Sequence, residues 1–347
     1  MNRVGGDPDR VLVIKLRYVG DVLLATPVLT RLRKGFPKAR LAMLVNAGTE
    51  AAVQGHPAVD EVLVLERESL LRQWRFVREL RARRFDLVVD LTDGDRSAVL
   101  AWLSGASIRL GYNSEGRWRG RLYTEIIDAD RFGMHTVDYH LAVTEALGLT
   151  GPPPAPILTV APEARHAADR LLQEAGIERA RPLVCLHPGA RWWFKSWPSE
   201  RFAALADRIQ TETAAQALFL GGEQDREVGS RIAARMTTPH RTLIGRTGLK
   251  ELAAVLERAV LMVSNDNGPM HMAAALGVPV VGLFGPSDSA IWGPWGEGHH
   301  VFYKGLDCRA CFHPDCFRGE QNCMRQITLD EVWGSVKEVL SRICALH

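Results

Sequence analysis

The stretch AVLMVSNDNGPMHMAAALGVPVVGLFGPSD, residues 259–288, decides the fold of this chain. An apolar run ends in the polar segment SNDNGP, a helical segment follows at once, and a second apolar run comes after it. Short apolar runs that alternate with helical segments are typical of parallel strands joined by crossover helices. The stretch therefore predicts a strand, a tight turn, a helix and a second strand of an α/β fold.

The same alternation extends through most of the chain. In the second half it predicts strands at 182–189, 217–222, 240–245, 259–266 and 278–285, with helices near 198–211, 225–235 and 249–258. In the first half it predicts strands at 10–16, 39–45, 61–65, 85–91 and 106–112, with helices near 20–35, 69–84 and 95–104. We expect two doubly wound, Rossmann-like domains.

A proline-rich segment separates the two halves. GPPPAP, residues 151–156, holds four prolines and is neither helix nor central strand, so it is interpreted as a linker. The length of 347 residues also favours two domains. We predict domains at 1–155 and 156–327 that face each other across a cleft, where the carboxyl ends of the strands bind ligands.

Composition and charge narrow the function classes. The chain is 46% hydrophobic and 24% charged, as in ordinary soluble enzymes. Its net charge of +3 gives no case for nucleic acid as a partner. Arginines nevertheless gather in 67–84 and 109–121. These segments are either solvated surfaces laced by ion pairs or a dock for an anionic partner, such as lipid headgroups or a phosphorylated acceptor.

No segment has the pattern of a membrane span or a signal peptide. The longest uncharged apolar stretch, 274–285, is interrupted by Gly and Pro and is shorter than the roughly 18 residues of a span. The N-terminal apolar run has only four residues. We expect a cytoplasmic protein.

The turn after the strand at 259–266 has the features of an anion-binding site. Gly268 lets the backbone approach a ligand, and Pro269 suits the start of a helix, whose free N–H groups face negative charge. His271 lies one turn inside the helix, where it is either an ordinary core histidine or a phosphate contact.

The end of the first strand offers a candidate base. The following KLRYVGD lacks the G-x-G-x-x-G of dinucleotide folds, so a dehydrogenase is not expected. Gly20 is predicted to form a tight turn, and Asp21 to start a helix over 21–34. Asp21 is then either a helix cap or a general base.

Three further segments carry polar groups, and the sequence allows two roles for each of them. Arg191 and Lys195, on the loop after the strand at 182–189, could meet a phosphate or could be solvated beside packed tryptophans. Asp225 could accept ribose hydroxyls or could be a helix N-terminal acid. Asp93 and Asp95 form a D-x-D pattern that could hold a divalent metal or simply make a polar turn.

Four cysteines fall close together in a segment, 308–323, that is predicted to be a loop: Cys308, Cys311, Cys316 and Cys323. Their C-x2-C-x4-C-x6-C spacing is compatible with a structural zinc or iron site, although it is not the paired spacing of a zinc ribbon.

These motifs together resemble glycosyltransferase family 9, the heptosyltransferases of lipopolysaccharide core assembly, and most of all the heptosyltransferase III type. The resemblance rests on VLVIKLRYVGDVLLATPVLTRLRKGFP, FDLVVDL, GASIRLGY, HTVDYHLAVTEALGL, HPGARWWFKSWP and SNDNGPMHMAAALGVPVVGLFGPSD. It implies a GT-B fold with an N-terminal acceptor domain, a C-terminal nucleotide-sugar domain, and a last helix, within 328–347, that packs back on the first domain.

The resemblance also implies an activity. It is the inverting transfer of heptose from ADP-L-glycero-D-manno-heptose to the inner core of lipopolysaccharide, with no cofactor in the chemistry. The acceptor would be the lipid A-core oligosaccharide, reached from the inner face of the inner membrane by a peripheral protein. Alternatives are a protein heptosyltransferase acting on autotransporters, a nucleotide-sugar epimerase, and a non-catalytic binding protein.

Site roles carried over from the family fall on matching positions. Asp21 would be the base, Lys195 would neutralise the donor phosphates, and Asp266 and His271 would hold the phosphate and the reacting sugar. The expected catalytic residues are thus Asp21, Lys195 and His271, and the expected donor-binding residues are Gly20, Arg191, Asp225, Asp266, Asn267, Gly268 and Pro269. Arg191, Trp192 and Trp193 stand where some members carry threonines.

Overall fold

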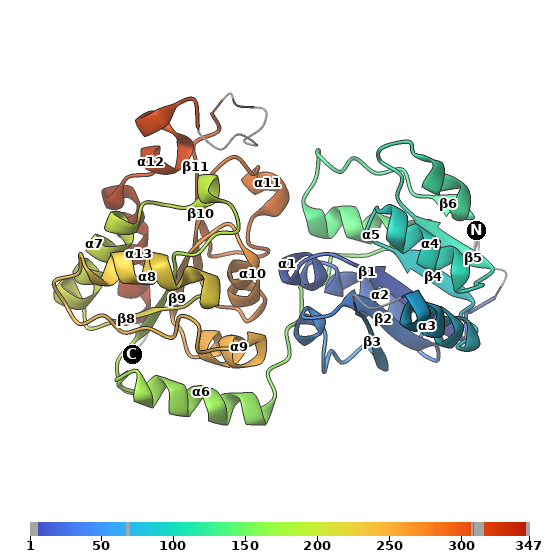
Figure 1. Ribbon diagram of the computed structural model, residues 1–347, viewed down its shortest axis with the longest axis horizontal. Coiled ribbons are helices and arrows are strands. Elements are labelled where there is room, and N and C mark those ends of the chain that lie inside the picture. The colour runs from blue at the N-terminus through green and yellow to red at the C-terminus, as the bar shows by residue number, and fades with distance from the viewer. Residues whose placement is uncertain (1–5, 67–69, 307, 309–315, 345–347) are drawn as a thin grey trace. The chain divides into compact units, whose positions relative to one another are not determined.

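The computed structural model describes residues 6–66, 70–306, 308 and 316–344. The chain divides into two compact units, Met1–Thr159 and Val160–His347. In Figure 1 the first unit runs from blue to green and the second from green to red. The division falls close to the expected boundary at 155–156. Each unit is an α/β structure around a parallel sheet, which confirms the predicted class.

The first unit holds a six-stranded parallel sheet in the order β3-β2-β1-β4-β5-β6. The strands are β1 Arg10–Lys15, β2 Arg40–Asn46, β3 Glu61–Leu65, β4 Leu87–Asp90, β5 Ile108–Gly111 and β6 Glu125–Ile126. The helices are α1 Val19–Leu23, α2 Thr26–Gly35, α3 Leu70–Ala82, α4 Asp95–Leu103 and α5 Thr136–Ala146, with short 3-10 turns at Glu50–Ala52 and Trp118–Leu122. This is the strand order of a Rossmann fold.

Two details of the first unit differ from the sequence prediction. The single helix expected over 20–35 is two helices, because Pro27 at the start of α2 lacks an N–H and disfavours helical geometry in the preceding residue. Gly20 is not in a tight turn: it is a buried residue of α1. The central strand β1 is buried from Val11 to Lys15, since helices cover both faces of such a sheet.

The second unit holds a five-stranded parallel sheet in the order β11-β10-β9-β7-β8. The strands are β7 Leu183–His187, β8 Gln216–Phe219, β9 Leu261–Asn265, β10 Val280–Phe284 and β11 His300–Tyr303. The helices are α6 Pro162–Glu174, α7 Ser199–Glu212, α8 Arg226–Ala233, α9 Leu249–Glu257, α10 Gly268–Ala275, α11 Ser289–Trp292, α12 Cys323–Gln326 and α13 Leu329–Cys344. Short 3-10 turns lie at Trp193–Lys195, Glu223–Asp225 and Gly319–Gln321.

One predicted strand of the second unit is wrong and one strand was missed. The segment 240–245 pairs with the sheet only through a bridge between Phe219 and Thr242. The chain then turns at Gly245, whose φ of 72° suits glycine. The missed strand is β11, which lies at the sheet edge with alternating exposure and has no long apolar run to reveal it.

The last helix, α13, packs within the second unit. Val332, Trp333 and Val336 are buried in the core of that unit, and α13 contacts α7, β9 and β10. The expected packing of segment 328–347 on the first domain stays a prediction. The Trp197 indole N–H donates to Ile327 O at 2.8 Å and so ties the residues before α13 to the second unit.

Candidate functional site

The loop between β9 and α10 is built around two asparagines. Asn267 caps α10, since its Oδ1 accepts from the N–H of Met270 at 3.2 Å. Its Nδ2 donates to Gly189 O at 2.9 Å. Asn265 Nδ2 donates to Pro188 O at 2.8 Å in the same way. The loops after β7 and β9 are therefore held together by side-chain amides.

Lys195 and Asp266 form a close ion pair at the edge of this loop, with Nζ 2.6 Å from Oδ2. Lys195 is the last residue of the 3-10 turn Trp193–Lys195, and its side chain is 23% exposed. Lys195 is therefore a partly exposed member of an ion pair. Because Asp266 lies two residues before α10, the pair lies beside the N-terminus of that helix, where N–H groups favour anions.

Asp225 lies against the same pair of loops. Its buried carboxylate accepts from the N–H of Gly222 through Oδ2 at 2.8 Å. A Cβ on Gly189 would come within 2.4 Å of this carboxylate, so only glycine fits there. Asp225, Gly189, Trp193 and Phe194 line a pocket of about 430 Å³. One aromatic wall and a fixed carboxylate suit a ring that carries hydroxyl groups.

Apart from Gly20, which lies on α1 in the first unit, the other expected donor residues lie on the same two loops or on α10, as does the expected catalytic residue His271. His271 is 6% exposed on α10, and Gly268 and Pro269 are the first two residues of that helix. The Arg191 guanidinium stacks over the ring of Trp192, 5.4 Å from its centroid. Trp192 and Trp193 are each about half exposed.

Asp21, in the first unit, lies on α1 in contact with a buried lysine. No side-chain hydrogen bond caps α1, so the cap interpretation of Asp21 is wrong. Its Oδ1 lies 3.9 Å from Lys15 Nζ. The same Nζ donates to Leu91 O at 2.8 Å and lies 2.8 Å from His140 Nε2. Sequence analysis did not single out Lys15 or His140, although a lysine at the end of an apolar strand is itself a signal.

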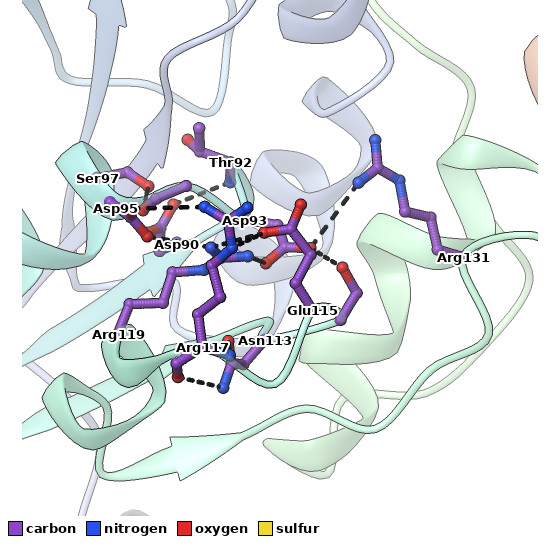
Figure 2. Close-up of polar contacts among 12 residues, drawn as sticks. Asp90, Thr92, Asp93, Asp95, Ser97, Asn113, Glu115, Arg117, Arg119 and Arg131 are labelled. Carbon is purple, nitrogen blue, oxygen red and sulfur yellow. Dashed lines mark hydrogen bonds and ion pairs between the residues drawn. The ribbon is translucent and has the colours of Figure 1, made fainter.

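A second polar cluster follows β4, and Figure 2 shows its members converging from three segments. Arg119, buried, donates to Asp93 Oδ1 at 2.8 Å and to Asp95 Oδ1 at 3.0 Å. Arg131 Nη1 lies 3.8 Å from Asp93 Oδ2. The two aspartates of the D-x-D pattern are therefore engaged by arginine, which does not support the divalent-metal interpretation. Part of the basic segment 109–121 is correspondingly internal.

The strand end beside this cluster carries a third carboxylate. Asp90 is fully buried and accepts from the N–H of Thr92 at 2.8 Å and from Tyr123 OH at 2.7 Å (Figure 2 labels Asp90 and Thr92). Burial raises the pKa of Asp90. The polar groups at the carboxyl end of β4 therefore form hydrogen bonds with one another.

The cysteine segment is only partly described. Cys308, Cys316 and Cys323 line one small pocket together with Arg318, whose Nε lies 2.9 Å from Cys308 Sγ. Cys311 lies outside the described residues. Within the described ranges, no three His, Cys, Asp or Glu side chains gather as metal ligands would. A structural zinc or iron at these cysteines stays a prediction.

Comparison with known proteins identifies the family. The model of glycosyltransferase family 9 (heptosyltransferase) matches residues 73–321, more than half of the chain. The chain belongs to glycosyltransferase family 9. It is therefore a glycosyltransferase, and the matched range contains Lys195, Asp225, Asp266 and His271.

Family 9 members resemble this chain over nearly their whole length. Lipopolysaccharide heptosyltransferase 3 of Escherichia coli K12 is 30% identical, with 84% of this chain and 86% of that protein covered. Lipopolysaccharide heptosyltransferase 2 of Salmonella typhimurium is 25% identical, with 96% and 99% covered.

A solved structure shares the fold. The family 9 glycosyltransferase from Veillonella parvula superposes with a TM-score of 0.85 at 26% identity, covering 96% of this chain and 97% of its own. With two Rossmann-like units, the family 9 chain has the predicted GT-B fold class.

None of the helices in the described ranges has the length and apolar character of a membrane span.

Proposed function

We propose that this family 9 enzyme transfers heptose, with inversion, from ADP-L-glycero-D-manno-heptose to the inner core of lipopolysaccharide. The observation that carries the proposal is the Lys195–Asp266 pair beside the N-terminus of α10, where a cation and the positive end of the helix dipole suit a diphosphate. Support comes from the E. coli and Salmonella relatives, which are lipopolysaccharide heptosyltransferases. An E. coli heptosyltransferase of this fold was solved with ADP-2-deoxy-2-fluoro heptose.

In the proposed reaction an acceptor hydroxyl oxygen forms a bond to the anomeric carbon as the bond from that carbon to the ADP oxygen breaks. Asp21 takes the hydroxyl proton, and the electron pair of the broken bond stays with ADP. Lys195 turns from Asp266 to the diphosphate, whose charge grows as it leaves. Asp225 accepts the ribose hydroxyls, and His271 contacts the phosphate or the sugar. None of these steps uses a cofactor.

The test is product formation by the purified protein. ADP release and a heptose-sized mass increase of a heptose-deficient core glycolipid are expected with ADP-heptose. UDP- and GDP-sugars should give none. Transfer from another nucleotide sugar alone, or turnover of the donor without any acceptor, contradicts the proposal. Transfer to an autotransporter peptide but not to the glycolipid would move the acceptor assignment to protein.

We also propose that the enzyme works at the cytoplasmic, inner face of the inner membrane as a peripheral protein. Helix α3 supports this proposal, because one side of it packs into the core through Leu80 while the other is exposed. On the exposed side Leu71 is 83% and Trp74 is 65% accessible. Arginines 75, 78 and 81 accompany them. Aromatic, aliphatic and cationic groups on one helix face fit an anionic lipid surface.

Vesicle sedimentation tests the membrane proposal. The protein should sediment with phosphatidylglycerol vesicles, more weakly at high salt, and not with phosphatidylcholine vesicles. Leu71→Ser with Trp74→Ser should abolish sedimentation. Trp102→Ser, which removes a tryptophan that is 53% exposed on α4, is the matched control. Equal sedimentation of both variants would contradict the role of α3.

A further inference from the structure

The ammonium group of Lys15, the last residue of β1, is buried among acceptor atoms. Lys15 is 4% exposed, because β1 is central in the sheet and covered on both faces. Its Nζ faces Leu91 O and His140 Nε2 at 2.8 Å each, and Asp21 Oδ1 at 3.9 Å. An ammonium group has three N–H donors. Two acceptors therefore lie at hydrogen-bond distance from the ammonium, and Asp21 is an ion-pair partner at a longer distance.

The hydrogen bonds of His140 determine which of its ring nitrogens carries the proton. His140 is fully buried on α5, and burial together with the Lys15 charge holds its pKa well below the ordinary value. Its Nδ1 lies 3.1 Å from Leu24 O, a group that only accepts. The neutral ring therefore carries its proton on Nδ1, and Nε2 offers a lone pair to Lys15. The histidine acts as an acceptor and not as a second cation.

Lys15 is charged at neutral pH, because its pKa stays above 7. Burial lowers the pKa of Lys15 to about 8, and the Asp21 carboxylate opposes that shift. The charged groups around it are Asp21 on α1, Arg17 after β1, Asp90 on β4 and Arg131 before α5. A buried ammonium that remains charged needs an anion nearby, and Asp21 is its nearest carboxylate in the ion pairs of the described residues.

We propose that Lys15, oriented by His140, is a positioning residue that fixes the direction of the Asp21 carboxylate for proton abstraction. The inference rests on the proposed function, in which Asp21 is the base. Lys15 does not touch the substrate in this proposal. Its cation fixes the direction of one Asp21 oxygen, and the other oxygen is left to receive the proton of the acceptor hydroxyl.

Lys15→Met tests the inference, because the side chain keeps its length and loses its charge. We expect kcat to fall roughly 10- to 100-fold, less than the loss that removal of a general base causes. The affinity for ADP, bound by the second unit in the proposed function, should stay unchanged. Arg10→Met is the matched control, since it removes a cation at the opposite, exposed end of the same strand.

The pH profile separates this role from a merely structural one. Wild-type kcat should decline above pH 8 as Lys15 loses its proton, because the ammonium form is present below its pKa and lost above it. Lys15→Arg should keep most of the activity and move that decline to higher pH.

Two further variants keep the inference falsifiable. If Lys15→Met does not fold, His140→Leu, which removes one acceptor of the ammonium, should lower kcat and shift the decline above pH 8. Wild-type kcat and profile in a folded Lys15→Met or His140→Leu would overturn the inference. Asp21→Asn is measured in parallel: an active Asp21→Asn overturns the base assignment and this inference together. An inactive one beside a normal Lys15→Met overturns the inference alone.

Discussion

Each unit contains a lysine–aspartate pair beside a helix that follows a parallel strand, and the two pairs are built differently. In the first unit Lys15 Nζ lies 3.9 Å from Asp21, and the lysine side chain is 5% exposed. In the second unit Lys195 Nζ lies 2.6 Å from Asp266, and the lysine side chain is 23% exposed. The first pair is long and its lysine is enclosed, whereas the second is short and its lysine is more accessible.

The surroundings of the two lysines indicate which of them can exchange its partner for a ligand. Lys15 also faces a carbonyl and an imidazole, so moving it would leave buried acceptors unsatisfied, which is costly. Lys195 is more accessible, and a diphosphate at the start of α10 could replace its aspartate. We therefore expect the first lysine to be a fixed charge and the second to be exchanged between protein and ligand.

The largest effect should come from the carboxylate of the enclosed pair. Asp21→Asn keeps the size of the side chain and removes the base, so kcat should fall about 10²- to 10⁴-fold. ADP affinity by calorimetry should not change, because only the first unit is altered. A fall in ADP affinity that matches the fall in kcat would contradict this separation of roles.

Substitution of Lys195, in the accessible pair, should change ADP affinity, whereas substitution of Asp21 should not. Lys195→Met should weaken ADP binding roughly 10- to 100-fold, since a hydrogen bond to a charged group contributes about 1.5–3 kcal/mol. We expect kcat of Lys195→Met to fall as well. Lys250→Met, on the exposed surface of α9, is the control with an equal charge change. Equal ADP affinity in Lys195→Met and wild type would show that Lys195 does not meet the diphosphate.

The loop that presents the accessible pair should depend on its cap. Asn267→Ala removes the α10 cap and the bond to Gly189 O, so the free energy of unfolding should fall by about 1–2 kcal/mol. Chemical denaturation measures this loss. ADP affinity should fall as well, because the loops after β7 and β9 are no longer tied. Unchanged stability and affinity would mean that the backbone alone holds these loops.

The smallest effect is expected at the acid next to the pocket carboxylate. Glu223 is 70% exposed and pairs with Arg226 on the surface, so Glu223→Gln should leave thermal unfolding and ADP affinity unchanged. Asp225→Asn, two residues on, should weaken ADP binding because the buried carboxylate faces the pocket. A larger effect at Glu223 than at Asp225 would reverse the assignment of the ribose contact.

Sequence reasoning found much of the second site, because its groups lie in one continuous turn. Asn267, Gly268 and Pro269 stand together at a strand end, and local rules for helix starts were sufficient to predict their place. The enclosed pair was only half found. Asp21 was singled out, but His140 follows Lys15 by 125 positions, and no local pattern joins residues that far apart.

The fold shows the same division. Long apolar strands such as β1, β7 and β9 were predicted, since burial on both faces leaves a run of β-branched and aliphatic residues. The edge strand β11 was not predicted, because only part of an edge strand is buried and its sequence has no long apolar run.

Residue spacing was enough to predict the alternation of strands and helices, the family and the polar turns where strands end, because these features depend on order along the chain. Tertiary structure alone decided that Lys195 pairs with Asp266, that Arg119 is internal and that Lys15 lies between Asp21 and His140. Those pairings depend on distances across the sheet. Burial then makes each unmatched charge costly, so the fold selects partners that sequence spacing does not reveal.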